Sequence, residues 1–168
     1  MLHLPQKPSN VLLIDADLRA VLSDVGLAQM SGSGVPASNF SMMGTAGLIA
    51  PLVTNSGEYS ELTDGYAVGV SILMALTGLA ALNLRNICRH MLCSPTSLIA
   101  WRAPGKADEA AGRWPDEVAV GMAELAAGLT TEFTDDRIPL REALARVEAL
   151  CDCHAAQPAA APTAAPSA

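Results

Sequence analysis

The feature that most constrains this chain is a run of residues without a charge, 65–84, which lies between Asp64 and Arg85. A helix that is apolar on every side is either a membrane span or the central helix of a globular core. The run is long enough for either, because about twenty residues cross a bilayer. The interpretation of the rest of the chain depends on which of the two it forms.

Several details of this run favour the globular core. Three glycines dilute its apolar content, and a serine, a threonine and an asparagine interrupt it. Asp64 stands at its start, where a carboxylate can cap free backbone N–H groups and favour the helix dipole. Arg85 and Arg89 follow the run, but no basic residue precedes it back to Arg19, so the charge asymmetry of a membrane protein is weak. We therefore expect a buried central helix, and a single membrane span is the less favoured alternative.

Composition and charge bound the class of protein. The chain of 168 residues suits one domain or part of a larger one, and 51% hydrophobic against 16% charged residues give ample apolar surface to bury. The net charge of −7 argues against nucleic acid as a partner, because phosphate binding needs clustered Lys and Arg. The N-terminus MLHLPQKPSN lacks the layout of a signal peptide, so we expect a cytoplasmic location.

The cysteines and nearby histidines are candidate zinc ligands. They form two groups with the spacings C-x-H-x-x-C and C-x-C-H, namely Cys88, His90 and Cys93, and Cys151, Cys153 and His154. These spacings are not among the common structural zinc patterns. We expect cysteines here to act as small apolar residues on or near helices, and a metal site is the less favoured alternative.

The N-terminal part of the chain predicts a small hairpin. Two short apolar runs, Val11–Ile14 and Leu18–Leu22, flank the polar turn Asp15–Asp17. A loop rich in serine and glycine follows at 29–43, and loops of this length are usually functional or disordered. The polar stretch Asn55–Thr63 then leads into the central helix.

The C-terminal part predicts further helices. Ile87–Leu92 can continue as helix, and Pro115 followed by two acidic residues starts another, with apolar residues at helical spacing after it. A last helix begins near Pro139. The tail 155–168 is Ala/Pro-rich and of low complexity, so we expect it to be disordered and assign residues 1–154 to the folded domain.

Five segments of the chain, taken in order, form the pattern on which the functional interpretation depends. His3–Asn10 (HLPQKPSN) resembles the catalytic loop H-R-D-x-K-P-x-N, and Asp24–Gly26 resembles D-F-G. Gly44–Leu52 is similar to G-T-x-G-Y-x-A-P-E, Asp64–Val70 to D-V-Y-S-F-G-V, and Asp136–Pro139 to D-R-P-x. Together they resemble the C-terminal lobe of a eukaryotic protein kinase, most like the receptor-like and Pelle-type serine/threonine group.

This resemblance covers roughly residues 3–150 and implies a fold. The expected fold is mainly α with a small β-hairpin, a protein-kinase-like C-terminal lobe around a buried central helix. The family's corresponding helix is the buried pillar of the lobe, so the resemblance agrees with the globular interpretation of the uncharged run.

The resemblance also assigns roles in phosphoryl transfer, which depends on positioning and charge neutralisation. Asn10 and Asp24 match the ligands that hold Mg²⁺ against the phosphates of ATP, and oxygen ligands suit this ion. Lys7 matches the lysine that meets the transferred phosphoryl group. Thr45 matches a threonine beside the substrate hydroxyl.

Four further positions match residues that support the site. Gly26 belongs to the nucleotide-side turn after Asp24, and His3 matches a histidine that packs inside the lobe. Asp64 matches an aspartate that hydrogen-bonds the backbone of the catalytic loop. Arg137 matches an arginine that normally pairs with a glutamate.

The departures from the family pattern bear directly on activity. Pro5 occupies the position of the catalytic aspartate, and proline has no acceptor side chain; loss of a general base typically costs about 10²–10⁴-fold in rate. Leu4 replaces the arginine that would read a phosphorylated loop, and Val25 replaces the phenylalanine of D-F-G. Leu52 replaces the glutamate that would pair with Arg137.

Two expectations follow from these departures. An unpaired buried arginine could cost roughly 3–5 kcal/mol, so we expect Arg137 to turn to Asp135, Asp136 or solvent. No glycine-rich phosphate loop, strand lysine or helix glutamate of an N-terminal lobe precedes His3 in this sequence. We therefore expect weak binding of ATP, if any, and exposed apolar groups where the other lobe would cover the site.

Three functions remain open on the sequence. The first is a pseudokinase-like chain that is inactive in phosphoryl transfer and acts by protein interaction. The second is part of an active serine/threonine protein kinase whose N-terminal lobe lies upstream or on another chain. The third and least favoured is a single-span membrane protein. The partner is accordingly a protein or the missing lobe.

Overall fold

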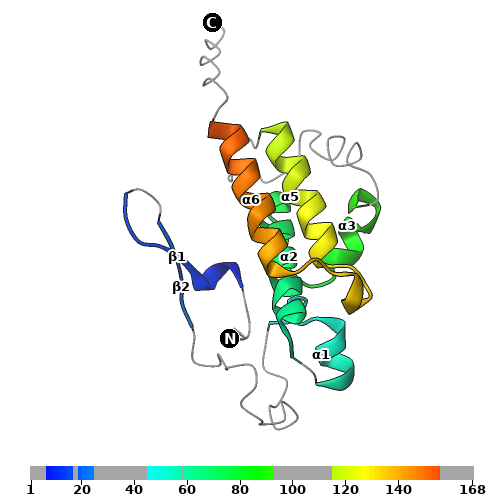
Figure 1. Ribbon diagram of the computed structural model, residues 1–168. Coiled ribbons are helices and arrows are strands. Elements are labelled where there is room, and N and C mark those ends of the chain that lie inside the picture. Colours follow the sequence, from blue (N-terminus) through cyan, green and yellow to red (C-terminus); the bar gives the residue numbers. More distant parts are fainter. Residues whose placement is uncertain (1–6, 17–18, 25–44, 58, 93–114, 156–168) are drawn as a thin grey trace, which may run out of the picture.

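The computed structural model describes residues 7–16, 19–24, 45–57, 59–92 and 115–155. It contains short 3₁₀ helices, one pair of strands and several α-helices (Figure 1). In chain order the elements are η1 (Pro8–Asn10), β1 (Val11–Leu13), β2 (Ala20–Leu22), α1 (Pro51–Ser56), α2 (Glu61–Thr77), α3 (Leu84–Leu92), α5 (Asp116–Leu129), η5 (Thr134–Asp136) and α6 (Leu140–Ala155). The expected mainly helical fold with a small hairpin is confirmed.

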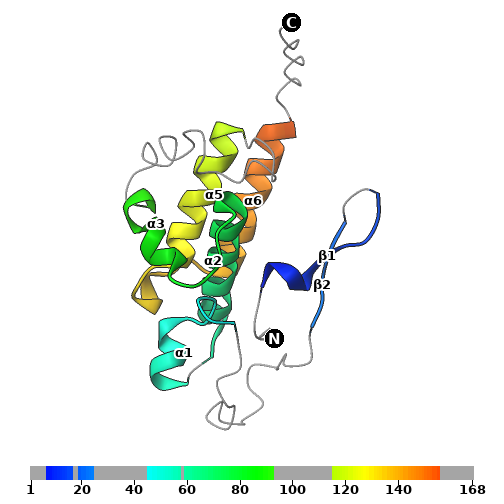
Figure 2. The same ribbon diagram turned by 180° about the vertical axis from the view of Figure 1, so that it is seen from behind.

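Helix α2 is the centre of the packing. It lies behind α5 and α6 in Figure 1 and in front of them in Figure 2, and α3 lies beside it. Val70 and Leu73 are 0% exposed on the side that meets α1 and α3. Val68 and Ile72 pack against the cluster that α5 and α6 form. The buried central helix expected from the uncharged run is confirmed, and none of the helices described is long and apolar enough to cross a membrane.

The ends of α2 differ from those expected. The helix begins after Ser60, whose side-chain oxygen accepts a hydrogen bond from the Thr63 N–H (3.3 Å), while the Thr63 hydroxyl oxygen accepts one from the Ser60 N–H (2.8 Å). This reciprocal capping box satisfies backbone N–H groups at the start of the helix. The helix ends at Thr77 because Gly78 adopts a left-handed conformation with φ of 68°. The uncharged run therefore forms α2 and the turn that leads to α3.

Helix α1 was not expected from the sequence. Pro51 occupies its first turn, Gly57 ends it with φ of 71°, and Val53 is its buried residue. From the sequence, this region was expected to be a break in regular structure followed by a polar stretch. A helix of six residues with a single buried side chain has too little periodicity to be detected.

Helix α5 approaches α2 closely at Gly69. A Cβ atom at this position would lie 2.7 Å from Thr130 Cγ2, 2.8 Å from Leu129 Cβ and 3.2 Å from Ala126 O. Such distances are far below normal contact, so α5 can pack at this depth only because residue 69 has no side chain. Gly69, one of the glycines that lower the apolar content of the uncharged run, is therefore required for the close packing of α2 and α5.

The last two long helices are confirmed close to the expected positions. Helix α5 begins after Pro115 with Asp116 and Glu117 in its first turn, and α6 begins just after Pro139. Between them lies a second apolar cluster, whose buried members are Leu125, Leu129 and Ala143.

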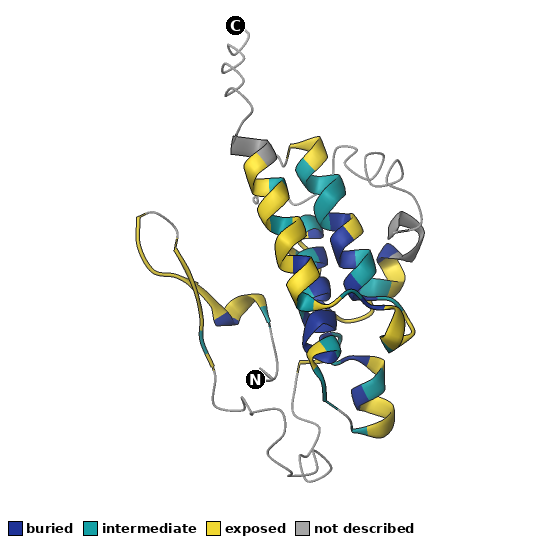
Figure 3. Cartoon of the chain, in the orientation of Figure 1, coloured by how far each residue is buried: buried dark blue, intermediate teal, exposed yellow. Residues whose placement is uncertain are grey.

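The hairpin is confirmed, with strands shorter than expected. Strands β1 and β2 are antiparallel, with Val11 opposite Leu22 and Leu13 opposite Ala20. Every strand residue is exposed, as the yellow ribbon in Figure 3 shows. The hairpin lies to one side of the helices in both views of the chain. The expected loop at 29–43 and residues 156–168 of the expected tail lie outside the described residues, whereas Ala155, expected in the tail, is the last residue of α6.

Candidate functional site

The hairpin brings Asn10 and Asp24 together. Asn10 is 5% exposed, and its Nδ2 donates a hydrogen bond to Asp24 Oδ2 at 3.3 Å. The backbone oxygen of Asn10 accepts hydrogen bonds from the Ser23 N–H (2.7 Å) and the Ser23 hydroxyl (2.9 Å). The two positions expected to share a magnesium ion are therefore adjacent.

The strand register explains this proximity. Asn10 is the last residue of η1 and directly precedes β1, while Ser23 directly follows β2. Because Val11 pairs with Leu22, the next residues outward, Asn10 and Ser23, also meet. Asp24 adopts φ of 60°, a left-handed conformation that aspartate tolerates better than most residues. Local folding of the hairpin is thus enough to pair the amide with the carboxylate.

The Asn10–Asp24 pair has the chemistry of a weak magnesium site. A carboxylate and an amide supply the oxygen ligands that Mg²⁺ prefers, and the ion commonly completes its shell with water and phosphate oxygens. The described residues contain no group of three or more His, Cys, Asp or Glu that could hold a metal ion. The pair therefore offers oxygen types that suit Mg²⁺, but the described residues form no metal cage around it.

The other expected catalytic positions are less closely connected. Lys7 is half-buried and directly precedes η1, and Thr45 is exposed and accepts the Leu48 N–H at its backbone oxygen (3.0 Å). Among the described residues, no hydrogen bond or ion pair is present at the side chains of Lys7 and Thr45, and none links them to the Asn10–Asp24 pair. His3, Pro5 and Gly26, together with Leu4 and Val25, lie outside the described part of the chain.

Asp64 occupies a position suited to its expected structural role. It lies in the first turn of α2 and is 4% exposed, and its N–H donates to Ser60 O at 3.1 Å. Helix α2 also contacts η1, the element that carries Asn10. The role of Asp64 in holding the backbone of the catalytic loop stays a prediction.

The expectation for Arg137 was wrong. The side chain is 4% exposed and turns inward, where Nε donates to Thr131 O (3.0 Å) and Nη1 to Leu62 O (3.3 Å). Its guanidinium carbon lies 4.9 Å from the centroid of the Tyr66 ring. Within the described residues its Nη2 has no hydrogen-bond partner and no carboxylate reaches it. Asp135 and Asp136 are exposed in the short helix η5, just before Arg137. The guanidinium of Arg137 turns away from them, toward backbone carbonyls.

The burial of Arg137 beside Tyr66 shifts the pKa values of both side chains. Burial lowers the pKa of Arg137, while the Tyr66 hydroxyl raises it and the charge of Arg85 lowers it. Burial raises the pKa of Tyr66 against the opposite effects of the two arginines. An arginine stays protonated under such shifts, so a positive charge is held in the core by carbonyl oxygens and an aromatic face.

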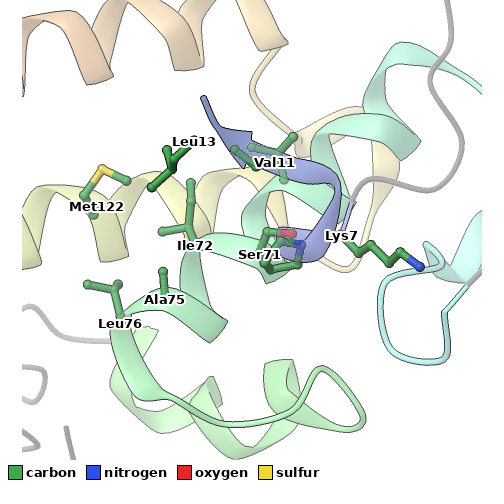
Figure 4. Close-up of a pocket in the computed structure, with 10 residues that line it drawn as sticks. Lys7, Val11, Leu13, Ser71, Ile72, Ala75, Leu76 and Met122 are labelled. Carbon is green, nitrogen blue, oxygen red and sulfur yellow. The ribbon is translucent and has the colours of Figure 1, made fainter. Parts of the chain in front are cut away.

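An apolar groove lies between the hairpin and the helices, and the sequence analysis did not identify it. Its volume is about 440 Å³, and Figure 4 shows Leu13, Ile72 and Met122 gathered along one side of it. Its lining residues are Lys7, Pro8, Val11, Leu13, Val68, Ser71, Ile72, Ala75, Leu76 and Met122. The signal in the sequence was the absence of charge from the part of the central helix after Asp64, which leaves more apolar surface than the helices of the core cover.

The chain is similar in sequence to plant kinases, although no family model matches it. It is 42% identical over 78 residues to the L-type lectin-domain containing receptor kinase VII.1 of Arabidopsis thaliana, a match that covers 46% of this chain and 11% of that protein. It is 32% identical over 104 residues to the proline-rich receptor-like protein kinase PERK2 of the same organism, covering 62% of this chain and 14% of the relative.

A longer alignment is found with a protein whose name does not describe it as a kinase. The U-box domain-containing protein 33 of Arabidopsis thaliana is 30% identical over 148 residues, which cover 88% of this chain and 17% of that protein. The chain thus spans between 11% and 17% of the length of these relatives.

A solved structure shares the fold. The pseudokinase domain of BIR2, described as an immune regulator of the RLK/Pelle family, matches with a TM-score of 0.70 at 23% identity, covering 93% of this chain and 46% of that one. Sequence and fold therefore confirm the resemblance expected from the motifs: this is a protein-kinase-like chain, related to the receptor-like kinases and similar to the C-terminal lobe of their kinase domain.

Proposed function

We propose that this chain does not transfer phosphate and acts by binding protein. The observation that carries the proposal is Pro5, which stands where the kinase pattern has the catalytic aspartate. A proline side chain can neither orient nor deprotonate a hydroxyl, and the general base contributes about 10²–10⁴-fold to such reactions. The exposed hairpin and the apolar groove support the interaction role, because surfaces of this kind commonly contact other proteins.

The proposal includes a reduced role for nucleotide. Asn10 and Asp24 would hold Mg²⁺ if ATP were bound, and the ion would neutralise charge on the phosphates. Lys7 and Thr45 would then be remnants of the transfer site. The kinase-like domain is proposed to comprise residues 1–154, with 155–168 as a separate tail, in a chain that acts in the cytoplasm.

A phosphoryl-transfer assay tests the proposal. The full chain is incubated with labelled ATP, Mg²⁺ and casein, beside the variants Lys7→Met and Pro5→Asp. We expect no transfer above background from the wild type or from Lys7→Met. Wild-type transfer that Lys7→Met removes would refute the proposal, and a gain of transfer in Pro5→Asp alone would identify the missing acceptor as the cause of inactivity.

The second candidate is part of an active serine/threonine kinase. The specific observation in its favour is the Asn10–Asp24 contact at 3.3 Å, since the two expected Mg²⁺ ligands remain paired. The genomic sequence upstream of Met1 distinguishes the two candidates. An in-frame glycine-rich loop followed by a Val-Ala-x-Lys strand would favour the active kinase, and an in-frame stop codon would favour the interaction module.

A further inference from the structure

A group of hydrogen-bond donors without acceptors lies where α2, α3 and the segment between α5 and α6 meet. Arg137 is 4% exposed, and its Nη2 has no hydrogen-bond partner in the part of the chain that the structure describes. Tyr66 is 6% exposed, and no hydrogen bond joins its hydroxyl to a described residue. The guanidinium carbon of Arg137 lies 4.9 Å from the centroid of the Tyr66 ring, so the two side chains belong to one cluster.

Arg85 brings a second positive charge to this cluster. It is half-buried near the start of α3, and its Nε donates to Thr130 O at 2.6 Å. Arg137 Nε donates to the next carbonyl oxygen along the chain, Thr131 O, at 3.0 Å. Burial raises the pKa of Tyr66 and lowers that of Arg137, and the charge of Arg85 lowers the pKa of both. The three side chains therefore act on one another.

No carboxylate balances these charges among the described residues. The ion pairs found there join other arginines to acids, and neither Arg85 nor Arg137 takes part in one. Backbone carbonyls and an aromatic face carry only partial charge, so they leave two like charges incompletely neutralised in a partly buried place. The cluster is therefore rich in donors and positive charge and lacks an anion.

We propose that Arg85, Arg137 and Tyr66 together bind a small monovalent anion such as chloride. Guanidinium groups only donate hydrogen bonds, and their bonds to an anion are stronger than those to a neutral acceptor. The burial of Arg137 and Tyr66 limits the ligand to a very small ion, and the half-buried Arg85 lies on the side of the cluster that solvent reaches. This inference goes beyond the proposed function and does not depend on it.

Urea unfolding of the full chain at constant ionic strength tests the proposal. About 200 mM sodium gluconate is replaced in steps by sodium chloride, so that general screening of charges stays the same. An anion that binds only the folded state stabilises it, and with a dissociation constant of about 10 mM this chloride concentration lowers the unfolding equilibrium constant about twentyfold. Wild-type protein that is equally stable or less stable in chloride overturns the proposal.

A matched pair of variants tests the location of the site. Arg85→Gln removes the half-buried charge of the cluster, and Arg141→Gln removes an exposed charge of α6. Both variants are first checked by circular dichroism for native helix content in gluconate. We expect Arg141→Gln to keep the full chloride effect and Arg85→Gln to reduce it to less than about threefold. An equal chloride effect in the two variants overturns the assignment of the site to this cluster.

Chlorine NMR detects binding to the wild-type chain directly, so it decides the question even where a variant does not fold. Exchange of chloride with a protein site broadens its resonance, and the excess width should saturate with a midpoint of about 10 mM and be removed by bromide. Excess width that is absent, or that grows without saturating, overturns the proposal. Neither measurement involves phosphoryl transfer or a protein partner, so a negative result here leaves the proposed function standing.

Discussion

The helical core and the hairpin are built from similarly apolar sequences, but their apolar side chains are buried in the core and exposed in the hairpin. In the core, side chains such as Val70 and Leu73 are fully buried between helices. In the hairpin, six large apolar side chains are between 40% and 62% exposed: Val11, Leu12, Leu13, Ile14, Val21 and Leu22. The difference lies in the neighbours and not in the residues, because the hairpin has no element packed over it among those described. The comparison teaches that apolar composition predicts burial only where a covering element is present.

The hairpin is held by local interactions instead. In its turn the Arg19 N–H donates to Asp15 Oδ1 (2.9 Å), and the side chains of the two residues form an ion pair at 3.3 Å. The Ile14 N–H donates to Arg19 O at 3.1 Å. Exposed ion pairs and turn hydrogen bonds each stabilise by about 1 kcal/mol or less, whereas one buried leucine contributes several times that. We therefore expect the core to resist unfolding much more strongly than the hairpin.

The largest effect is expected from truncating the core. Leu73→Ala removes a fully buried side chain of α2 and should lower the free energy of unfolding by about 2–5 kcal/mol, through lost burial and the cavity left behind. Leu144→Ala, at a 59% exposed position of α6, is the control and should change it by less than about 0.5 kcal/mol. Urea titration followed by circular dichroism measures both; equal effects would contradict the assignment of α2 as the buried centre.

The second effect concerns the close approach of α2 and α5. Gly69→Ala should destabilise by about 1–3 kcal/mol, because its new methyl group meets Leu129 Cβ, which is fixed to the backbone. Gly121→Ala is the matched control, since its methyl group would meet the end of the flexible Leu150 side chain at 2.5 Å, which can move. The control should be neutral or slightly stabilising through helix propensity. The same urea titrations compare them, and a neutral Gly69→Ala would show that the helices are not packed at this depth.

The third effect depends on pH. Burial raises the pKa of the Cys88 thiol to about 11, above its value in an unfolded chain. Between those values the unfolded state releases the thiol proton and the folded state keeps it, so the free energy of unfolding falls as pH rises. The expected loss is about 1 kcal/mol between pH 9 and pH 10. It is measured as the difference between the wild type and Cys88→Ala, and a difference that stays constant over this range would show that the thiol is not buried.

The smallest effect on stability is expected in the hairpin. Leu13→Ser removes an apolar side chain that is already 62% exposed, so the free energy of unfolding should change by less than about 0.5 kcal/mol. A loss of stability comparable to that of Leu73→Ala would show that the hairpin is part of the folded core.

Local patterns predicted a large part of this structure. Two short apolar runs and the polar turn between them predicted the hairpin, and the proximity of Asn10 and Asp24 is explained by the strand register. The uncharged run predicted a buried helix, although a single capping glycine, Gly78, ended it earlier than its hydropathy indicated.

Features that depend on distant neighbours could not be predicted in the same way. The inward turn of Arg137 depends on where Thr131 and Leu62 present their carbonyl groups, which is a tertiary property. The groove depends on the relative position of β1 and α2, two elements separated by many residues. The resemblance to kinases predicted exposed apolar groups where the other lobe would cover the site, but it did not predict which side chains would line this groove.

Hydrogen exchange of the full chain, resolved by peptide mass spectrometry, tests the central claim most directly. The account predicts that amides of α2 around Val70 and Leu73 exchange slowest and those of β1 and β2 at least about a hundredfold faster, since local opening of the hairpin exposes no core. Hairpin amides as protected as those of α2 would contradict the division into a buried helical core and an exposed hairpin held by local interactions.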